Sequence, residues 1–139
     1  MNLKEQLIKE EGSVPYAYPD SMGYLTIGVG RLIDKRKGGH LSDDEIDYLL
    51  QNDIKKVTGQ VLEALPWVNT MNEPRQAVVF GMAFQMGVHG LLSFMSTLSA
   101  MRDEHYEHAA EGMRQSLWAK QTPARAKRLA YQMETGEWQ

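Results

Sequence analysis

The sequence has no cysteine among its 139 residues. Disulfides, thiolate catalysis and cysteine-ligated metal sites are therefore excluded. It also lacks an excess of positive charge, because its formal net charge is −3, whereas nucleic-acid binding normally requires a basic surface. A carbohydrate substrate remains compatible with this charge, since sugars are held mainly by hydrogen bonds and stacking.

Long apolar runs are missing as well. The longest, Ala77 to Phe84, is far short of the roughly 20 residues that a membrane-spanning helix needs. Residues 1–6 become charged at once and contain no apolar segment typical of a secretion signal. We therefore expect a protein that is made soluble in the cytoplasm, has no stable membrane association, and reaches any extracytoplasmic target by another route.

A short helix is predicted at the amino terminus, where Asn2 and Glu5 form a capping-box pattern and Gly12 ends the segment. Its apolar face consists of Leu3, Leu7 and Ile8. On a helical wheel, Glu11 falls roughly 30° from the centre of this face and Glu10 about 70° from it. We therefore expect Glu11 to point inward, and acidic side chains are rarely buried without a function.

A small β-sheet is predicted after this helix. Residues 20–23 have turn-forming chemistry, and residues 24–30 then alternate in polarity. One face of the alternating segment has Leu25, Ile27 and Val29, and the other has Tyr24, Thr26, Gly28 and Gly30. The glycines on the second face would let another group approach the backbone closely.

A long helix is predicted to begin at the capping box formed by Ser42 and Glu45. Apolar residues repeat at helical spacing along it, at Ile46, Leu50, Ile54, Val57 and Val61. We therefore expect this helix to run to about Ala64.

The remaining segments are predicted to be helical with breaks, one of them near Gly87. The last helix begins at Thr122-Pro123, a favourable start signal, and ends at Gly136. The chain is thus predicted to be a single α+β domain. A small β-containing lobe at about 13–50 is joined by the long helix to an all-helical lobe at about 60–139.

Three residues form the candidate catalytic group. Glu11 is an inward-facing acid, Asp20 is an acid in a turn, and Thr26 has a hydroxyl on the adjoining strand. Glycoside hydrolysis needs a carboxylic acid that protonates the leaving oxygen, and a carboxylate that attacks the sugar or orients a water. These residue types suit that chemistry. On spacing alone, however, a structural role for Glu11 at a helix end and for Asp20 in a turn explains them more often.

Four blocks of the sequence, in order, resemble the lysozymes of T-even phages. The first is Glu11, eight residues, Asp20, five residues, and then Thr26-Ile27-Gly28-Val29-Gly30. The others are Phe84-Gln85-Met86-Gly87, the stretch from Trp118 to Arg128 that contains Gln121-Thr122-Pro123 and Arg125, and Thr135-Gly136-x-Trp138. The resemblance covers nearly the whole chain, and four ordered blocks argue strongly against chance.

The resemblance implies a lysozyme-like two-lobed fold, with helix 2–11 packed against the helical lobe and the active cleft between the lobes. It implies hydrolysis of the β-1,4 bond between N-acetylmuramic acid and N-acetylglucosamine in bacterial peptidoglycan. By family analogy the reaction inverts the anomeric centre. Glu11 is then the general acid, Asp20 and Thr26 activate a water, and Arg125 matches the arginine that pairs with the catalytic glutamate.

The family's substrate-binding positions fall on four residues, Leu32, Phe84, Thr97 and Gly112. The ring of Phe84 either faces a sugar or belongs to the core, and the sequence leaves both readings open. Gly30, which ends the first block, is expected to support the site. No cofactor and no metal ion are expected.

The sequence also departs from the family pattern. Arg31 stands where relatives have histidine, and Asp53 stands where its carboxylate partner would be, so the pair is expected to persist as Arg–Asp. Gly112 replaces an asparagine that touches substrate. The loop between residues 33 and 42 is shorter than usual.

The resemblance implies a monomeric phage endolysin, a bacteriolytic enzyme that lyses the host. It would act on the cell wall in the periplasm once a holin or another lesion permeabilises the membrane. Two alternatives stay open: a virion-associated or effector lysozyme domain, and a wall-binding relative without catalysis. The initiator-like Met1 and the absence of a linker favour the endolysin, and the intact Glu11, Asp20 and Thr26 argue against the non-catalytic relative.

Overall fold

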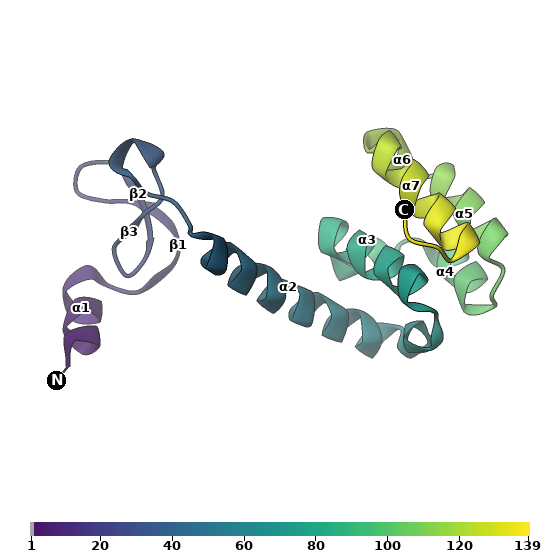
Figure 1. Cartoon of the computed structure of the whole chain (residues 1–139), viewed down its shortest axis with the longest axis horizontal. Coiled ribbons are helices and arrows are strands. Elements are labelled where there is room, and N and C mark those ends of the chain that lie inside the picture. The colour runs from purple at the N-terminus through teal and green to yellow at the C-terminus, as the bar shows by residue number, and fades with distance from the viewer. Residues whose placement is uncertain (1) are drawn as a thin grey trace. The chain divides into compact units, whose positions relative to one another are not determined.

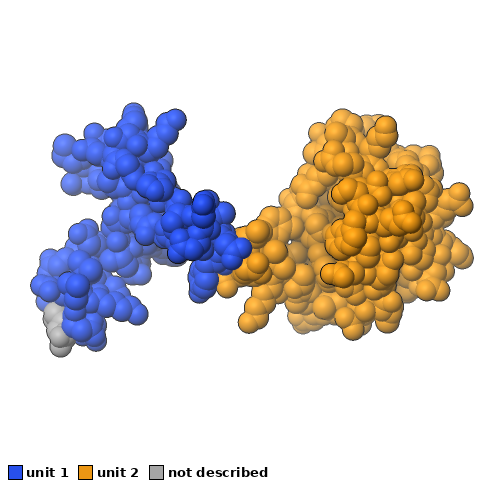
Figure 2. All heavy atoms as spheres, in the orientation of Figure 1, with its two compact units in different colours: residues 1–49 blue, residues 50–139 orange. Residues whose placement is uncertain are grey.

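The computed structural model describes residues 2–139, so the expectation that rests on Met1 lies outside the described residues. The chain forms two compact units, residues 1–49 and residues 50–139 (Figure 2). Helices dominate, and a small antiparallel sheet lies in the first unit (Figure 1). The predicted α+β class is therefore confirmed.

The first unit contains one helix and a three-stranded sheet in the order β1-β2-β3. Its elements are α1 (Leu3–Glu11), β1 (Val14–Pro19), β2 (Leu25–Gly28), β3 (Arg31–Leu32) and the 3-10 segment η1 (Lys35–Lys37). The predicted caps of α1 are confirmed: the Asn2 side chain accepts from the Glu5 backbone NH, the Glu5 carboxylate accepts from the Asn2 NH, and Gly12 ends the helix.

The long helix α2 (Asp43–Ala64) runs to the predicted residue. Its capping box is also present, because the Glu45 carboxylate accepts from the Ser42 backbone NH and the Glu45 NH donates to the Ser42 hydroxyl. The helix begins in the first unit, and its residues from Leu50 onward belong to the second.

The second unit is all helical after α2. Its elements are the 3-10 segment η2 (Pro66–Thr70), α3 (Glu73–Leu92), α4 (Met95–Arg102), α5 (Tyr106–Arg114), α6 (Leu117–Gln121) and α7 (Pro123–Thr135). The predicted end of a helix near Gly87 is confirmed as a break within α3. Gly87 adopts the non-helical φ 80° and ψ 159°, which glycine tolerates, so the helix is interrupted at a kink there and a second helical stretch follows to Leu92.

An apolar core lies in the second unit. Its largest fully buried side chains are Val61, Val68, Val78, Val79, Met82, Leu91, Met101, Met113 and Met133. Within residues 2–49, by contrast, only Thr26 and Gly39 are buried. Among the described residues, no single helix is long and apolar enough to cross a membrane, although α3 and α4, bent by 106°, meet that test as a pair.

Candidate active site

Asp20 is held by the turn between β1 and β2. Its Oδ1 accepts hydrogen bonds from the backbone NH groups of Met22, at 2.9 Å, and Tyr24, at 2.8 Å. The Asp20 NH donates in return to the Tyr24 carbonyl at 2.8 Å. Among the described residues both side-chain bonds fall on Oδ1, which leaves Oδ2 available to a water or a substrate.

Thr26 lies on β2, opposite Tyr18 of β1, and is only 3% exposed. Its hydroxyl donates to the Tyr24 carbonyl at 3.1 Å. Since a hydroxyl has one proton and two lone pairs, the Thr26 oxygen can still accept a hydrogen bond. At this position Thr26 is therefore an acceptor, as the carboxylate of Asp20 is.

The backbone of Tyr24 thus connects Asp20 with Thr26. Its carbonyl accepts from the Asp20 NH and from the Thr26 hydroxyl, and its NH donates to the Asp20 carboxylate. The sequence showed the turn chemistry at Asp20 but not this role of Tyr24. The available signal was the four-residue spacing, which suits an aspartate that accepts from backbone groups of its own turn.

The two faces of β2 differ from the expectation based on polarity. Thr26 faces the covered side, whereas Leu25, on the apolar face of the predicted strand, is 50% exposed. The strand also ends at Gly28, and Val29-Gly30 form a turn. In a unit with so few buried side chains, hydrogen bonding and turn geometry decide the orientation of the strand more than apolar burial does.

Glu11 is the last residue of α1, and its carboxylate lies directly over Gly30. A β-carbon on Gly30 would stand 2.9 Å from Glu11 Oε2 and 3.1 Å from Cδ. Gly30 also has φ +67°, a conformation that disfavours other residues. The predicted supporting role of Gly30 thus acquires a physical basis, because only glycine leaves room for the carboxylate there.

Within the first unit taken by itself Glu11 is exposed, so its inward orientation depends on what covers α1 and stays a prediction. Every residue of α1 is exposed, including the apolar residues of its predicted inner face. Residues 2–49 offer no apolar surface that covers this face.

Phe84 and Arg125 line the same groove of the second unit, which has a volume of about 340 Å³. Phe84 is 46% exposed within the second unit taken by itself, and its contact with a sugar stays a prediction. The Arg125 guanidinium donates to the Gly81 carbonyl through Nη2 at 3.5 Å. An aromatic ring and a guanidinium at one opening can offer stacking and hydrogen bonds to a sugar.

Thr97 and Gly112 form a second pair in this unit. A β-carbon on Gly112 would stand 2.5 Å from the Thr97 hydroxyl oxygen, and both residues line one groove with Trp118. The close approach of Thr97 explains why glycine occupies position 112. Leu32 lies in the first unit, opposite Thr26 on β3, and lines a pocket with Gly30.

Arg31 has a different partner from the expected Asp53. Its Nη1 lies 2.8 Å from Glu45 Oε2 and donates to Oε1 at 2.9 Å, within the first unit. Sequence reasoning identified Glu45 only as a helix cap. No three carboxylate or histidine side chains within residues 2–139 lie close enough together to hold a metal ion.

Comparison with known proteins gives a consistent result. The sequence model of the phage lysozyme family matches residues 8–132. Probable T4-type lysozyme 1 of Dictyostelium discoideum is 29% identical, with 97% of this chain and 95% of that protein covered. The pre-baseplate central spike protein Gp5 of Enterobacteria phage T4 is 30% identical over 98% of this chain and 28% of its own length. The peptidoglycan hydrolase gp36 of Pseudomonas phage phiKMV is 28% identical over 96% of this chain and 16% of its own length.

Proposed function

Since the chain belongs to the phage lysozyme family, and is thereby a glycoside hydrolase of peptidoglycan, we propose the bond that it cleaves and the way it does so. The bond is the β-1,4 linkage between N-acetylmuramic acid and N-acetylglucosamine, and cleavage inverts the anomeric carbon. The observation that carries this proposal is the arrangement of Asp20 and Thr26 on the backbone of Tyr24.

Asp20 and Thr26 both present acceptors, and a water has two protons to donate. A water that donates one proton to Asp20 Oδ2 and the other to Thr26 Oγ1 keeps a lone pair for the anomeric carbon. As its oxygen bonds to that carbon, Asp20 takes up one of its protons. The bond to the leaving oxygen breaks, and Glu11 protonates that oxygen.

A direct attack by Asp20 on the sugar would not need Thr26. In that mechanism the carboxylate itself bonds to the anomeric carbon, and a threonine hydroxyl already committed to the Tyr24 carbonyl adds nothing to the first step. The acceptor state of Thr26 therefore favours a held water. We accordingly expect a Glu11–Asp20 separation of roughly 6.5–9.5 Å, the range typical of inverting glycosidases.

The family resemblance supports two further assignments, one for Arg125 and one for helix 2–11. We assign Arg125 as the partner of Glu11, and we expect helix 2–11 to pack with the helical lobe at about 60–139. The surfaces of the two units, each taken by itself, support this. The apolar residues of α1 are exposed, and Arg125 stands in a groove lined mostly by apolar side chains.

The four substrate-binding residues follow from the same resemblance: Leu32, Phe84, Thr97 and Gly112. Their exposure differs, since Phe84 is half-exposed whereas Thr97 is buried beneath Gly112. We therefore expect Phe84 to make the largest contribution to sugar binding, through stacking on its ring.

The biological role that we propose is host lysis by a monomeric endolysin. It acts on the periplasmic cell wall after a holin or another lesion opens the membrane. Expressed alone in a Gram-negative host, the protein should accumulate without lysis, and the cells should lyse when the inner membrane is permeabilised. Lysis with an intact inner membrane would contradict the dependence on such a lesion.

A virion-associated role is the second candidate. It is favoured by the match to the central spike protein Gp5, of which this chain covers 28%. Antibodies against the protein distinguish the two roles: an endolysin is absent from purified virions, whereas a spike component is present in every particle.

The test of the proposed reaction is digestion of purified peptidoglycan with identification of the new reducing ends. Borohydride reduction should convert N-acetylmuramic acid, and not N-acetylglucosamine, to its alcohol. Thr26→Ala should lose about a hundredfold in activity, because the water loses one of its two holders, whereas Thr26→Ser should retain most of it. New ends at N-acetylglucosamine would refute the bond assignment, and an active Thr26→Ala enzyme would refute the role of the hydroxyl.

A further inference from the structure

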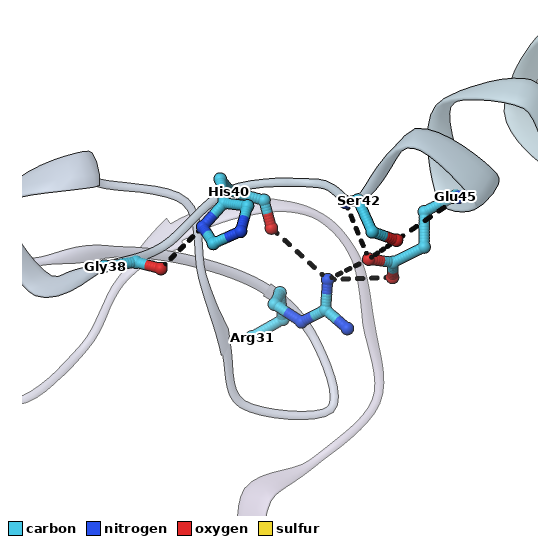
Figure 3. Close-up of polar contacts among 5 residues, drawn as sticks. All are labelled: Arg31, Gly38, His40, Ser42 and Glu45. Atoms are coloured by element: carbon cyan, nitrogen blue, oxygen red, sulfur yellow. Dashed lines mark hydrogen bonds and ion pairs between the residues drawn. The ribbon is translucent and has the colours of Figure 1, made fainter.

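An ion pair joins β3 to the beginning of α2 (Figure 3). Arg31 lies on β3 and Glu45 in the first turn of α2, 14 residues apart. Arg31 Nη1 reaches both carboxylate oxygens of Glu45, at 2.8 and 2.9 Å, and also donates to the His40 carbonyl at 3.4 Å. One guanidinium nitrogen thus ties the strand both to the helix and to the loop before it.

The carboxylate of Glu45 is fixed independently of Arg31. Its Oε1 accepts from the Ser42 NH at 3.0 Å and from the Ser42 hydroxyl at 2.8 Å. These two hydrogen bonds, followed by the one from Arg31, lower the pKa of Glu45 from 4.5 to about 2. Arg31 therefore binds a carboxylate that is ionised and held in place by the cap of α2.

The loop that leads to α2 is packed on the backbone of β3. A β-carbon on Gly39 would overlap the Leu32 carbonyl group, and Gly39 is buried. His40 Nδ1 lies 2.8 Å from the Gly38 carbonyl, which closes the turn next to it (Figure 3). The shortened loop thus meets β3 closely, at the strand where the Arg31 ion pair begins.

The strand anchored in this way belongs to the hairpin that carries the proposed site. On β3, Arg31 pairs with Ile27 of β2 and Leu32 pairs with Thr26. Arg31 also directly follows Gly30, over which the Glu11 carboxylate lies. A shift of β3 would therefore move the Thr26 hydroxyl and the backbone beneath Glu11 together.

We propose that Arg31 is a positioning residue, which fixes the β2–β3 hairpin to the capped start of α2 through Glu45 and so places Thr26 and Gly30 for catalysis. This inference rests on the proposed hydrolytic role of Thr26. A packed core does not hold the hairpin, because only Thr26 and Gly39 are buried within residues 2–49. The ion pair, together with the close approach of Gly39 to Leu32, holds β3 to the beginning of α2 instead.

An ion pair that only stabilised the fold would affect the free energy of unfolding and not the catalytic rate in particular. The Arg31 and Glu45 side chains are 46% and 37% exposed, and pairs this exposed contribute little to global stability. Catalysis, however, is sensitive to displacements of about 1 Å, which can reduce a rate about a hundredfold. The positioning role therefore predicts a loss in kcat that exceeds any loss in thermal stability.

The chain contains a matched control in the neighbouring ion pair of Asp34 and Arg36. The Arg36 side chain is 79% exposed and that of Asp34 is 12% exposed. The pair joins residues only two apart, within η1 and its cap. Arg36→Met removes the same kind of interaction without releasing β3. It should leave kcat unchanged.

The experiment measures kcat and KM on solubilised peptidoglycan fragments for Arg31→Met, Glu45→Gln, the double variant, Arg31→Lys and Arg36→Met. Glu45→Gln keeps an acceptor oxygen for Ser42, so the helix cap remains. We expect Arg31→Met to lower kcat about tenfold with KM within about twofold, and the double variant to lose no more than the worse single variant. Arg31→Lys should recover part of the loss, because it restores the charge without the fork of donors.

A readout that does not require activity accompanies the kinetics. Amide hydrogen exchange at Thr26 and Leu32 should be about tenfold faster in Arg31→Met than in Arg36→Met, while exchange in α5 stays the same. Unchanged exchange and unchanged kcat in Arg31→Met would overturn the positioning role, as would an equal effect of Arg36→Met. An inactive wild-type protein with the expected exchange pattern would instead refute the proposed function and leave the anchoring of the hairpin established.

Discussion

Residues 50–139 and residues 2–49 are stabilised in different ways. The second unit is organised around aliphatic and methionine side chains that are fully buried, from Val61 on α2 to Met133 on α7. In the first unit, Thr26 and Gly39 are the buried residues among those described, and the sheet is held by backbone hydrogen bonds, turns and ion pairs. The proposed acid and both proposed water holders belong to this first unit.

The proposed chemistry and the apolar core therefore lie in separate parts of the chain. A substitution in the core of the second unit should change global stability, and a substitution in the hairpins of the first unit should change activity. Sites of catalysis are often less stable than the scaffold that presents them. The following changes test this division, from the largest expected effect to the smallest.

Glu11→Gln should reduce peptidoglycan hydrolysis by about a thousandfold, because the amide cannot donate a proton to the leaving oxygen. The free energy of unfolding should change much less than the activity, because the amide has nearly the same shape as the carboxylate. Glu10→Gln is the matched control, one residue earlier on the same helix, and should stay active. Turbidity clearing and thermal melting measure the two properties, and equal loss of activity in both variants would refute the assignment of Glu11.

Leu91→Ala should destabilise the second unit by about 3 kcal/mol, the cost of deleting buried methyl groups and leaving a cavity. Leu25→Ala, on a half-exposed strand position of the first unit, should cost less than about 1 kcal/mol. Chemical unfolding followed by tryptophan fluorescence measures Leu91→Ala selectively, because Trp67, Trp118 and Trp138 all lie in the second unit, and amide exchange in the sheet of the first unit measures Leu25→Ala. A small effect of Leu91→Ala would show that the core is not what stabilises this unit.

Gly30→Ala should reduce activity at least about tenfold, because the new methyl group displaces the Glu11 carboxylate. Gly28→Ala is the control for backbone strain. Gly28 has φ +68° against +67° at Gly30, yet a β-carbon on Gly28 would meet nothing within 4 Å. Both variants should lose about 1–2 kcal/mol of stability from the left-handed backbone, and only Gly30→Ala should lose the activity as well.

The sequence predicted those elements whose signals are local. The capping boxes at Asn2 and Ser42 and the apolar spacing from Ile46 to Val61 gave the bounds of α1 and α2, because each signal acts within one or two turns of helix. The start of α7 at Pro123 and its end at Gly136 were predicted for the same reason.

Long-range features could not be predicted in the same way. Glu45 already had a local explanation as a helix cap, so nothing in the sequence pointed to its ion pair with Arg31, 14 residues away. The burial of Thr26 was hidden because polarity favoured the opposite face of β2. The contact of the Glu11 carboxylate with Gly30 depends on how α1 and the turn after β2 pack together, and the spacing of residues in the sequence does not specify that packing.

Acid should affect the first unit through Glu45. Its folded pKa of about 2 lies below the usual 4.5, so the folded state binds the proton less tightly than the unfolded state does. The stability that this group contributes is therefore present above about pH 4.5 and is lost as the pH falls through 2. The protection of the Thr26 amide, which is its exchange rate relative to the intrinsic rate at the same pH, should fall over this window, and Glu45→Gln should weaken that pH dependence. Identical profiles in both proteins would contradict the anchoring role of Glu45.

The most direct measurement of the central claim, that Asp20 and Thr26 hold the attacking water, is the anomeric configuration of the first product. Proton NMR during the hydrolysis of a β-linked peptidoglycan fragment, faster than mutarotation, resolves the two anomers. Inversion by a held water predicts that the α-anomer appears first in the wild-type protein. A β-anomer as the first product would contradict the claim, and a glycosyl adduct trapped on Asp20 would show in addition that Asp20 attacks the sugar directly.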